Sequence, residues 1–428
     1  MEIFGAKSIK GEIKVPGDKS ISHRSAIISS LTKDKVVIKN YLFSQDCINT
    51  LEVLEKLGVR IEKLDGNLII HGKGIDKLSE PNDILYVGNS GTTIRLLAGV
   101  LAAADFMSIL SGDKSINNRP MDRIINPLNK MGAKIYGRQG NTRAPIVIFG
   151  SKKLVGKKFK LNISSAQVKS CLILAGLFAR GETEIIQPEI SRDHTERMLE
   201  YFGANIIYDG KNTKIIAGSP LKGKSIYIPG DISSAAYFIV AGLILKNSHI
   251  IIKGVGMNPT RSYFLEILKK MGAKITVKNK RTINNEPIAD IEAFYSELNP
   301  AIITKEFIPN IIDEIPILCV AAAFADGKTI ISGAEELRYK ESDRISAIAS
   351  QFKKIGVDIL EKKDGLVIKG DKNLKTGEDL LDSFGDHRIA MSIAILSLRS
   401  KGKVKIMDSE CIDTSFPNFK YELKKATE

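Results

Sequence analysis

The sequence contains few of the residues that build disulfide frameworks or metal centres. Among its 428 residues there are four cysteines, five histidines and no tryptophan. No two cysteines form a C-x-x-C pair and no two histidines are spaced to share a metal, so we expect no disulfide, zinc or other metal site. Cys171 and Cys319 lie inside apolar runs, which favours buried free thiols.

Long hydrophobic runs are also missing. The longest, Ala235–Leu245 and the segment after Pro316, are shorter than the roughly 18–20 residues that cross a bilayer. Residues 1–20 have neither the apolar core of a signal peptide nor the Arg/Ser-rich character of a transit peptide. We therefore expect a cytoplasmic protein, monomeric and without membrane contact.

Basic residues are in excess, 63 against 49 acidic ones, for a net charge of +14. Such a field attracts anions, whether nucleic acid, acidic lipid or phosphorylated small molecules. Many lysines lie in KK, KDK or KNK turns typical of a solvated surface. Aromatic residues make up only 6%, and no helix-turn-helix or RNA-binding signature is present, so nucleic acid is the disfavoured target.

One internal repeat is a helix that ends at a glycine and leads into a strand. Gly at the position after a helix C-cap, where φ is positive, followed by a β-branched strand explains this pattern. The repeated segments are VLEKLGVRI, PLNKMGAKI, MLEYFGANI, ILKKMGAKI and FKKIGVDI, with glycines at 58, 132, 203, 272 and 356.

A second repeated element is a turn of small polar residues followed by a helix that is apolar nearly all round. Copies begin at Gly17, Gly88, Ile163, Gly230, Ile311 and Gly385. Helices of this kind are buried, and we expect each to begin with a capping Ser, Thr, Asp or Asn. The two repeats predict an α/β fold of two similar lobes, each of three βαβαββ units. The N-terminal lobe is expected over residues 17–229 and the C-terminal lobe over 1–16 plus 230–428, with residues 5–17 giving a strand that pairs in the C-terminal lobe.

The segment GSPLKGKS, residues 218–225, matches the phosphate-loop pattern G-x-x-x-x-G-K-[ST]. A phosphate loop needs a helix directly after it, because the helix N-terminus supplies the anion site. Here the residues on both sides have the sequence pattern of strands, and Pro220 lacks the backbone N–H that the loop would use to bind phosphate. We interpret the segment as a connection between strands.

Anion binding is expected instead at the six helix starts, whose free N–H groups carry partial positive charge. Lys19, Ser20 and Arg24 suit a phosphate or carboxylate. The small-residue turn Asn89–Thr93 lets the backbone approach a ligand, and Arg119 stands beside a rigid proline.

The C-terminal half supplies candidate acids and bases. Asp313 precedes a long apolar helix and is either a helix cap or a general base. The segment 338–344, RYKESDR, is either surface ion pairing or a cluster of functional charges. Lys340, Arg344 and Arg388 add cations, enough together with those above for substrates that carry two phosphates and two carboxylates.

Eight segments in this order closely resemble the 5-enolpyruvylshikimate-3-phosphate synthase family. They are GDKSISHR, GNSGTT, NNRPMDR, SAQVKS, RDHTE, the Asp313 segment, RYKESDR and GDHRIAM. The resemblance runs from about residue 5 to Phe416-Pro417. It implies two lobes that close on the substrates at an active site in the interlobe cleft, transfer of the enolpyruvyl group of phosphoenolpyruvate to the 5-hydroxyl of shikimate 3-phosphate through a tetrahedral adduct, and no cofactor.

The resemblance also implies residue roles. Asp313 takes the hydroxyl proton, and Glu341 with Lys19 delivers a proton to the enol methylene. Shikimate 3-phosphate is expected at Lys19, Ser20, Arg24, Ser165, Ala166, Gln167, Asp313 and Lys340. Phosphoenolpyruvate is expected at Lys19, Gly91, Arg119, Gln167, Arg344 and Arg388, with Asn89, Thr92, Arg192 and His387 in support.

The chain departs from some family members at Ala166, Glu336 and Thr414, where these have Ser, Asn and Lys. Two other functions stay open. The related UDP-N-acetylglucosamine enolpyruvyl transferase uses a loop cysteine, whereas the segment around residue 115 has none. A basic protein that binds RNA ends would show salt-sensitive RNA binding instead.

Overall fold

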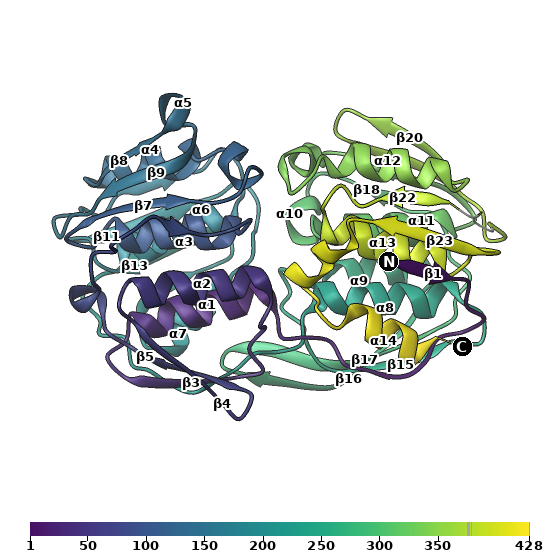
Figure 1. Ribbon diagram of the computed structural model, residues 1–428, viewed down its shortest axis with the longest axis horizontal. Helices are drawn as coiled ribbons and strands as arrows, with labels where there is room; N and C mark the ends of the chain where they lie inside the picture. Colours follow the sequence, from purple (N-terminus) through teal and green to yellow (C-terminus); the bar gives the residue numbers. More distant parts are fainter. Residues whose placement is uncertain (375–376, 378, 428) are drawn as a thin grey trace. The chain divides into compact units, whose positions relative to one another are not determined.

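The computed structural model describes residues 1–374, 377 and 379–427. Contacts divide the chain into two compact units (Figure 1). The N-terminal unit consists of Gly17–Ile228 and the short segment Ile283–Glu286. The C-terminal unit consists of Met1–Pro16, Pro229–Thr282 and Pro287–Glu428.

The N-terminal unit contains three four-stranded sheets with one topology. In each, the first two strands are parallel and the remaining pairs antiparallel. The first sheet, in spatial order, is β14 (Ile226–Tyr227), β3 (Lys35–Lys39), β5 (Asn67–His71) and β4 (Arg60–Leu64). The second is β6 (Leu85–Tyr86), β7 (Met107–Ser111), β9 (Arg143–Phe149) and β8 (Lys134–Gly137). The third is β10 (Lys158–Lys160), β11 (Glu182–Ile186), β13 (Asn212–Ile216) and β12 (Asn205–Tyr208).

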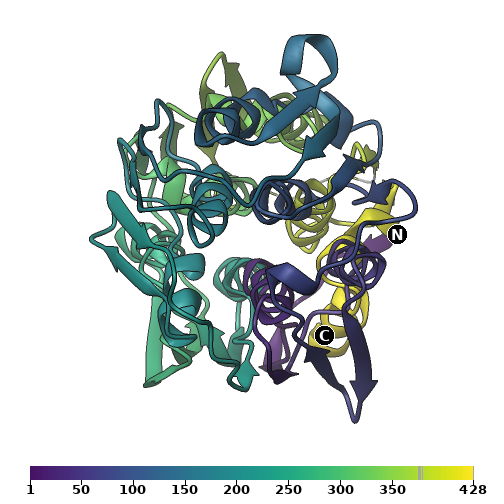
Figure 2. The same cartoon turned by 90° about the vertical axis from the view of Figure 1, so that its left-hand side faces the viewer.

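The helices of the N-terminal unit run nearly side by side and are seen almost end-on in Figure 2, inside the sheets. The buried ones are α1 (Lys19–Ser30), α3 (Gly91–Leu101) and α6 (Ala166–Gly176). The amphipathic ones are α2 (Gln45–Lys56), α4 (Asp122–Met131) and α7 (His194–Tyr201). Short turns complete the unit as α5 (Arg138–Asn141), η1 (Ile75–Lys77) and η2 (Ile116–Asn118).

The C-terminal unit repeats this plan with two four-stranded sheets and one three-stranded sheet. The first is β16 (Lys274–Ile283), β17 (Glu286–Phe294), β15 (His249–Gly256) and β2 (Lys10–Ile13). The second is β18 (Ile302–Ile303), β19 (Gly327–Ile331), β21 (Gly365–Gly370) and β20 (Asp358–Lys362). The third is β1 (Glu2–Phe4), β23 (Lys403–Met407) and β22 (Leu380–Asp382).

Three buried helices again form the centre of this unit: α8 (Ile232–Ile244), α11 (Ile315–Ala323) and α13 (His387–Ser397). Every residue of α8 and α11 is buried, as their all-round apolar sequences predict. The remaining helical segments are α9 (Tyr263–Lys270), α10 (Ile308–Ile311), α12 (Arg344–Lys354), α14 (Phe419–Ala426), η3 (Glu335–Tyr339) and η4 (Ser409–Thr414).

The predicted strand near the N-terminus is confirmed, because β2 pairs in parallel with β15 of the C-terminal unit. The glycines at the helix ends are also confirmed as left-handed: φ is 81° at Gly58, 104° at Gly132, 86° at Gly203, 90° at Gly272 and 93° at Gly356. The phosphate-loop lookalike at 218–225 connects β13 to β14, with no helix after it, as predicted.

Close packing of α3 on α6 depends on Gly99. A Cβ added there would lie 2.2 Å from the carbonyl oxygen of Cys171, a backbone atom that cannot rotate away. The Gly99→Ala substitution is therefore expected to lower the free energy of unfolding by about 3 kcal/mol, measured by urea denaturation. The control Gly256→Ala should lose less than about 1 kcal/mol, because its Cβ would meet nothing closer than 3.5 Å. Equal losses would contradict the packing argument.

Candidate functional site

Side-chain caps fix the starts of five of the six buried helices. Asp18, Ser90 and Ser165 accept hydrogen bonds from backbone N–H groups in the first turns of α1, α3 and α6. Asp231 and Asp386 do the same for α8 and α13. The expectation of a Ser, Thr, Asp or Asn cap is wrong for α11, whose N-cap is Glu314 with helical backbone and no side-chain cap bond.

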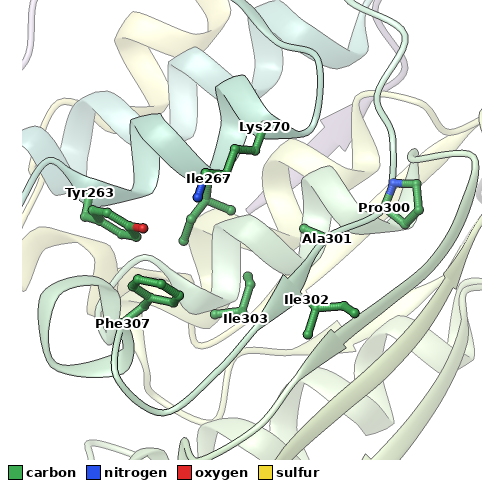
Figure 3. Close-up of a pocket in the computed structure, with 8 residues that line it drawn as sticks. All are labelled: Tyr263, Ile267, Lys270, Pro300, Ala301, Ile302, Ile303 and Phe307. Carbon is green, nitrogen blue, oxygen red and sulfur yellow. The ribbon is translucent and has the colours of Figure 1, made fainter.

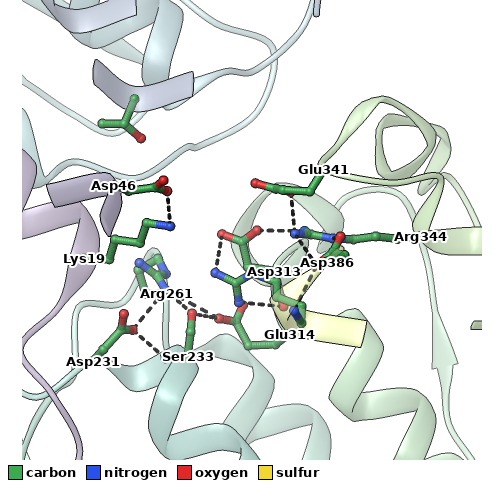
Figure 4. Close-up of polar contacts among 12 residues, drawn as sticks. Lys19, Asp46, Asp231, Ser233, Arg261, Asp313, Glu314, Glu341, Arg344 and Asp386 are labelled. Atoms are coloured by element: carbon green, nitrogen blue, oxygen red, sulfur yellow. Dashed lines mark hydrogen bonds and ion pairs between the residues drawn. The ribbon is translucent and has the colours of Figure 1, made fainter. Parts of the chain in front are cut away.

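In the N-terminal unit, the start of α1 presents two cations. Lys19 Nζ forms an ion pair with Asp46 Oδ2 of α2 (Figure 4). Arg24 is buried, and its guanidinium donates to Thr195 Oγ1 at 2.7 Å, Ser170 Oγ at 3.1 Å and the carbonyl oxygen of Ser20 at 3.0 Å. These three acceptors fix the orientation of the Arg24 guanidinium beside the start of α1.

The starts of α3 and α6 come together around Gly91. Gln167 donates from Nε2 to Thr92 Oγ1 at 3.1 Å and accepts from Arg95. A Cβ on Gly91 would lie 3.1 Å from Arg119 Nη1, so glycine leaves room for this guanidinium beside the helix start. Arg119 is held by Asn89 Oδ1, which accepts from its Nη2 at 2.5 Å. The structure thus places Gly91, Thr92, Arg119, Asn89 and Gln167 in one polar cluster.

The other predicted residues of this unit lie on the same or neighbouring segments. Ser20 follows Lys19 on α1, and Ser165 and Ala166 begin α6. Arg192 is half-buried in the loop before α7.

In the C-terminal unit, Arg344 is buried with only 1% of its side chain exposed and lies among three carboxylates (Figure 4). Its Nε donates to Asp386 Oδ2 at 2.8 Å, its Nη2 to Glu341 Oε2 at 2.5 Å and its Nη1 to Asp313 Oδ1 at 3.4 Å. Burial disfavours the charged guanidinium, but the three carboxylates outweigh burial and raise the pKa of Arg344 above its ordinary value. The segment RYKESDR is therefore not only surface ion pairing, because Arg344 forms a buried ion-pair cluster that includes Glu341.

Arg388 approaches the same carboxylate from α13. Its Nη1 donates to the backbone oxygen of Asp313 at 2.9 Å, and its Nη2 lies 3.5 Å from Asp313 Oδ2. Burial opposes its charge, yet Asp313 leaves the pKa of Arg388 raised. Asp313 therefore lies between two guanidinium groups, and the N-cap of α11 is the next residue, Glu314. His387 is buried at the first residue of α13, and Lys340 is half-buried directly after η3.

Sequence reasoning missed two polar groups at these helix starts. Asp46, the counter-ion of Lys19, could have been suspected as an acid in the first turn of α2. Arg261 contacts Ser233 Oγ at 2.5 Å and lies 3.5 Å from Glu314 Oε1. No local pattern connects Arg261 with Glu314, because 53 residues separate them in the sequence.

Elsewhere on the C-terminal unit lies a hollow of about 320 Å³ (Figure 3). It is lined by α9 residues including Tyr263 and Lys270, by residues 300–303 and by Phe307, whose ring stacks on Tyr263 with centroids 4.7 Å apart. Its lining is mostly apolar and includes no carboxylate and no histidine. Among the residues that the structure describes, no cluster of His, Cys, Asp or Glu could hold a metal ion, and no helix is long and apolar enough to span a membrane.

The fold is that of the enolpyruvyl transferases. The enolpyruvyl transferase NikO from Streptomyces tendae superimposes with a TM-score of 0.81 over 99% of this chain and 96% of its own, at 18% identity. EPSP synthase from Acinetobacter baumannii superimposes with a TM-score of 0.88 at 42% identity, over 99% of this chain and 97% of its own.

The sequence comparisons narrow this class to one family. The family model for EPSP synthase (3-phosphoshikimate 1-carboxyvinyltransferase) matches residues 3–423. The 3-phosphoshikimate 1-carboxyvinyltransferase of Petrotoga mobilis is 48% identical over 98% of this chain and 97% of its own. That of Citrifermentans bemidjiense is 48% identical over 97% of this chain and 96% of its own. The chain belongs to the EPSP synthase family.

His23, between Lys19 and Arg24, gives a pH-dependent stability. Burial, followed by the charges of Lys19 and Arg24, holds the pKa of His23 well below its ordinary value of 6.5. Above about pH 6.5 His23 is neutral in both the folded and unfolded states and contributes no pH dependence. Below about pH 6.5, the unfolded chain binds a proton at His23 that the folded chain does not bind. The free energy of unfolding therefore decreases as the pH is lowered.

The His23→Gln variant should therefore lose less stability between pH 7.5 and 5.5 than the parent, by about 1 kcal/mol. Urea denaturation at the two pH values measures this difference. Identical pH slopes for the two proteins would show that His23 takes up a proton in the folded state as readily as in the unfolded one.

Proposed function

We propose that this chain transfers the enolpyruvyl group of phosphoenolpyruvate to the 5-hydroxyl of shikimate 3-phosphate and releases phosphate. This places it in the shikimate pathway, which leads to chorismate and the aromatic amino acids. The observation that carries the proposal is the pair of polar clusters, one in each unit, built at helix starts from the residues that the family resemblance assigns to these two substrates. Both clusters act on one pair of substrates in this proposal.

Shikimate 3-phosphate would meet the starts of α1 and α6. Lys19 and Arg24 supply positive charge, while Ser20, Ser165 and Gln167 supply neutral hydrogen-bonding groups. Ala166 offers only its backbone N–H at the helix start, since it has no hydroxyl. Lys340 would add a further cation from the C-terminal unit. Because anions bind favourably at helix N-termini, the dipoles of α1 and α6 strengthen these contacts.

Phosphoenolpyruvate would meet Arg119, Arg344 and Arg388. The carboxylates of Asp313 and Glu341 contact the guanidinium of Arg344, and Asp313 also contacts Arg388. An incoming phosphate or carboxylate competes for the same N–H groups, because guanidinium pairs with both group types in the same fork geometry. Substrate binding would thereby release Asp313 and Glu341 for proton transfer.

The two released carboxylates then have different tasks. Asp313 takes the proton of the 5-hydroxyl as its oxygen attacks C2 of phosphoenolpyruvate, while the ammonium group of Lys19 supplies, through Glu341, the proton that the methylene carbon receives. The resulting tetrahedral adduct returns a proton from its methyl group to this pair as the C2–O bond to phosphate breaks. The guanidinium groups stabilise the charge on the departing phosphate. In this reaction all atoms and protons are supplied by the two substrates and the named side chains, so no cofactor is needed.

The proposal is tested by measuring phosphate release from phosphoenolpyruvate with two acceptors in parallel. Release with shikimate 3-phosphate and none with UDP-N-acetylglucosamine is the expected result, since segment 114–118, KSINN, offers no cysteine to act as proton donor. Phosphate release with the UDP-sugar alone would instead assign the chain the activity of the related UDP-N-acetylglucosamine enolpyruvyl transferase. If neither acceptor leads to phosphate release and the protein binds RNA in a salt-sensitive way, an RNA-binding function would be favoured.

Asp313→Asn tests the general base. The variant keeps the side-chain shape but removes the proton acceptor, so kcat should fall by about 10²–10⁴-fold. The dissociation constant for shikimate 3-phosphate, from isothermal titration calorimetry, should stay within about threefold because the anion contacts are unchanged. Unaltered kcat would remove Asp313 from the chemistry.

A further inference from the structure

The consecutive acids Asp313 and Glu314 face two different polar networks. Asp313 contacts Arg344 and Arg388, as described above. Glu314 turns toward the start of α8, where its Oε1 accepts a hydrogen bond from Ser233 and lies 3.5 Å from Arg261 Nη2 (Figure 4). The peptide that joins the two acids is therefore held from both sides.

The Glu314 network is continuous with the cap of α8. Asp231 Oδ1 accepts from the backbone N–H of Ser233 at 2.8 Å, and the same oxygen lies 3.7 Å from Arg261 Nη2. Arg261 also donates from Nη2 to Ser233 Oγ at 2.5 Å. Since Asp231, Ser233 and Glu314 all contact Arg261, one guanidinium ties the first turn of α8 to the first turn of α11.

All members of this network are buried, with Glu314 only 1% and Arg261 2% exposed. Neither Arg261 nor Glu314 has a task in the proposed reaction. A buried charged network adds little to stability compared with apolar packing. It does, however, allow few alternative arrangements of the groups that it joins, because any shift leaves a buried charge unpaired.

The backbone of Asp313 is held close to this network. The contacts of its carboxylate with Arg344 and Arg388, at 3.4 and 3.5 Å, are long for charge-assisted hydrogen bonds. Its backbone oxygen accepts from Arg388 Nη1 at 2.9 Å, and the next residue, Glu314, is anchored by Arg261 and Ser233. The anchoring of Glu314 therefore helps to set the position of Asp313.

We propose that Glu314 is a positioning residue for the reaction: its contacts with Ser233 and Arg261 fix the start of α11, so that Asp313 is held within reach of the acceptor hydroxyl when the arginines take up the anionic substrate. This inference rests on the proposed function. Glu314 touches neither substrate and acts only through Asp313.

A double-mutant cycle separates this role from general stabilisation. The purified full-length proteins compared are the parent, Glu314→Ala, Asp313→Asn and the double variant. If Glu314 acts through Asp313, Glu314→Ala lowers kcat in the parent but has little further effect once the base is gone, because there is no longer a base to position. Loss of fold integrity would instead lower kcat by the same factor in both backgrounds.

In the parent background, Glu314→Ala should lower kcat by at least about tenfold, since displacement of a reacting group by about 1 Å has effects of this order or larger. The KM for each substrate should stay within about threefold. In the Asp313→Asn background, the further decrease should be less than about threefold, measured by single-turnover quench. Glu314→Gln, which keeps the shape and an acceptor oxygen, should recover part of the lost kcat.

Glu422 provides a matched control, because it is another buried carboxylate of the same unit, on α14, with an oxygen that has no hydrogen-bond partner among the described residues. Glu422→Ala should keep kcat within about twofold even where its melting temperature falls. If Glu314→Ala does not yield folded protein, Ser233→Ala removes the same link and is expected to give the same non-additive pattern with Asp313→Asn.

Two results would overturn the inference. One is a parent-like kcat in Glu314→Ala, and the other is an equal fold decrease with and without Asp313. A parent protein that releases no phosphate in the presence of shikimate 3-phosphate would instead overturn the proposed function, and this inference with it. An active parent together with multiplicative effects would leave the proposed function standing and reject only the role of Glu314.

Discussion

The polar cluster of the C-terminal unit depends on the ion pairing of the buried Arg344 guanidinium. Such a charge is tolerated inside a protein only when carboxylates compensate it, and here Asp313, Glu341 and Asp386 do so. In the proposed reaction two of the groups that compensate the charge of Arg344 are thus also the ones that transfer protons.

The repeated βαβαββ plan explains how chemically different residues come to equivalent positions. Each buried helix lies in the interior of its unit, so its polar start is where function can be added. Lys19, Gly91 and Ala166 are the first residues of α1, α3 and α6, and His387 is the first of α13. The fold provides the helix dipole and free N–H groups at every start, and the sequence varies only the side chains there.

Much of this architecture could be predicted from local sequence. Left-handed glycines such as Gly132, the caps at Asp18 and Ser90 and the buried apolar helices follow from backbone and solvation rules that act over a few residues. The ties of Arg261 to Glu314 and of Lys19 to Asp46 could not be predicted in this way. They join helix starts that are distant in sequence, and a charged residue in a loop gives no sign of which partner the fold will bring to it.

The neighbouring acids at the start of α11 show why residue type alone did not decide between a cap and a base. A capping carboxylate is bound to backbone N–H groups, as Asp386 is, and cannot also exchange partners during a reaction. At α11 the N-cap Glu314 makes no side-chain cap bond and turns instead to Ser233 and Arg261. Asp313 contacts two guanidinium groups, and an incoming anion can take over these contacts. In the proposed reaction this exchange would make the carboxylate of Asp313 available to accept a proton.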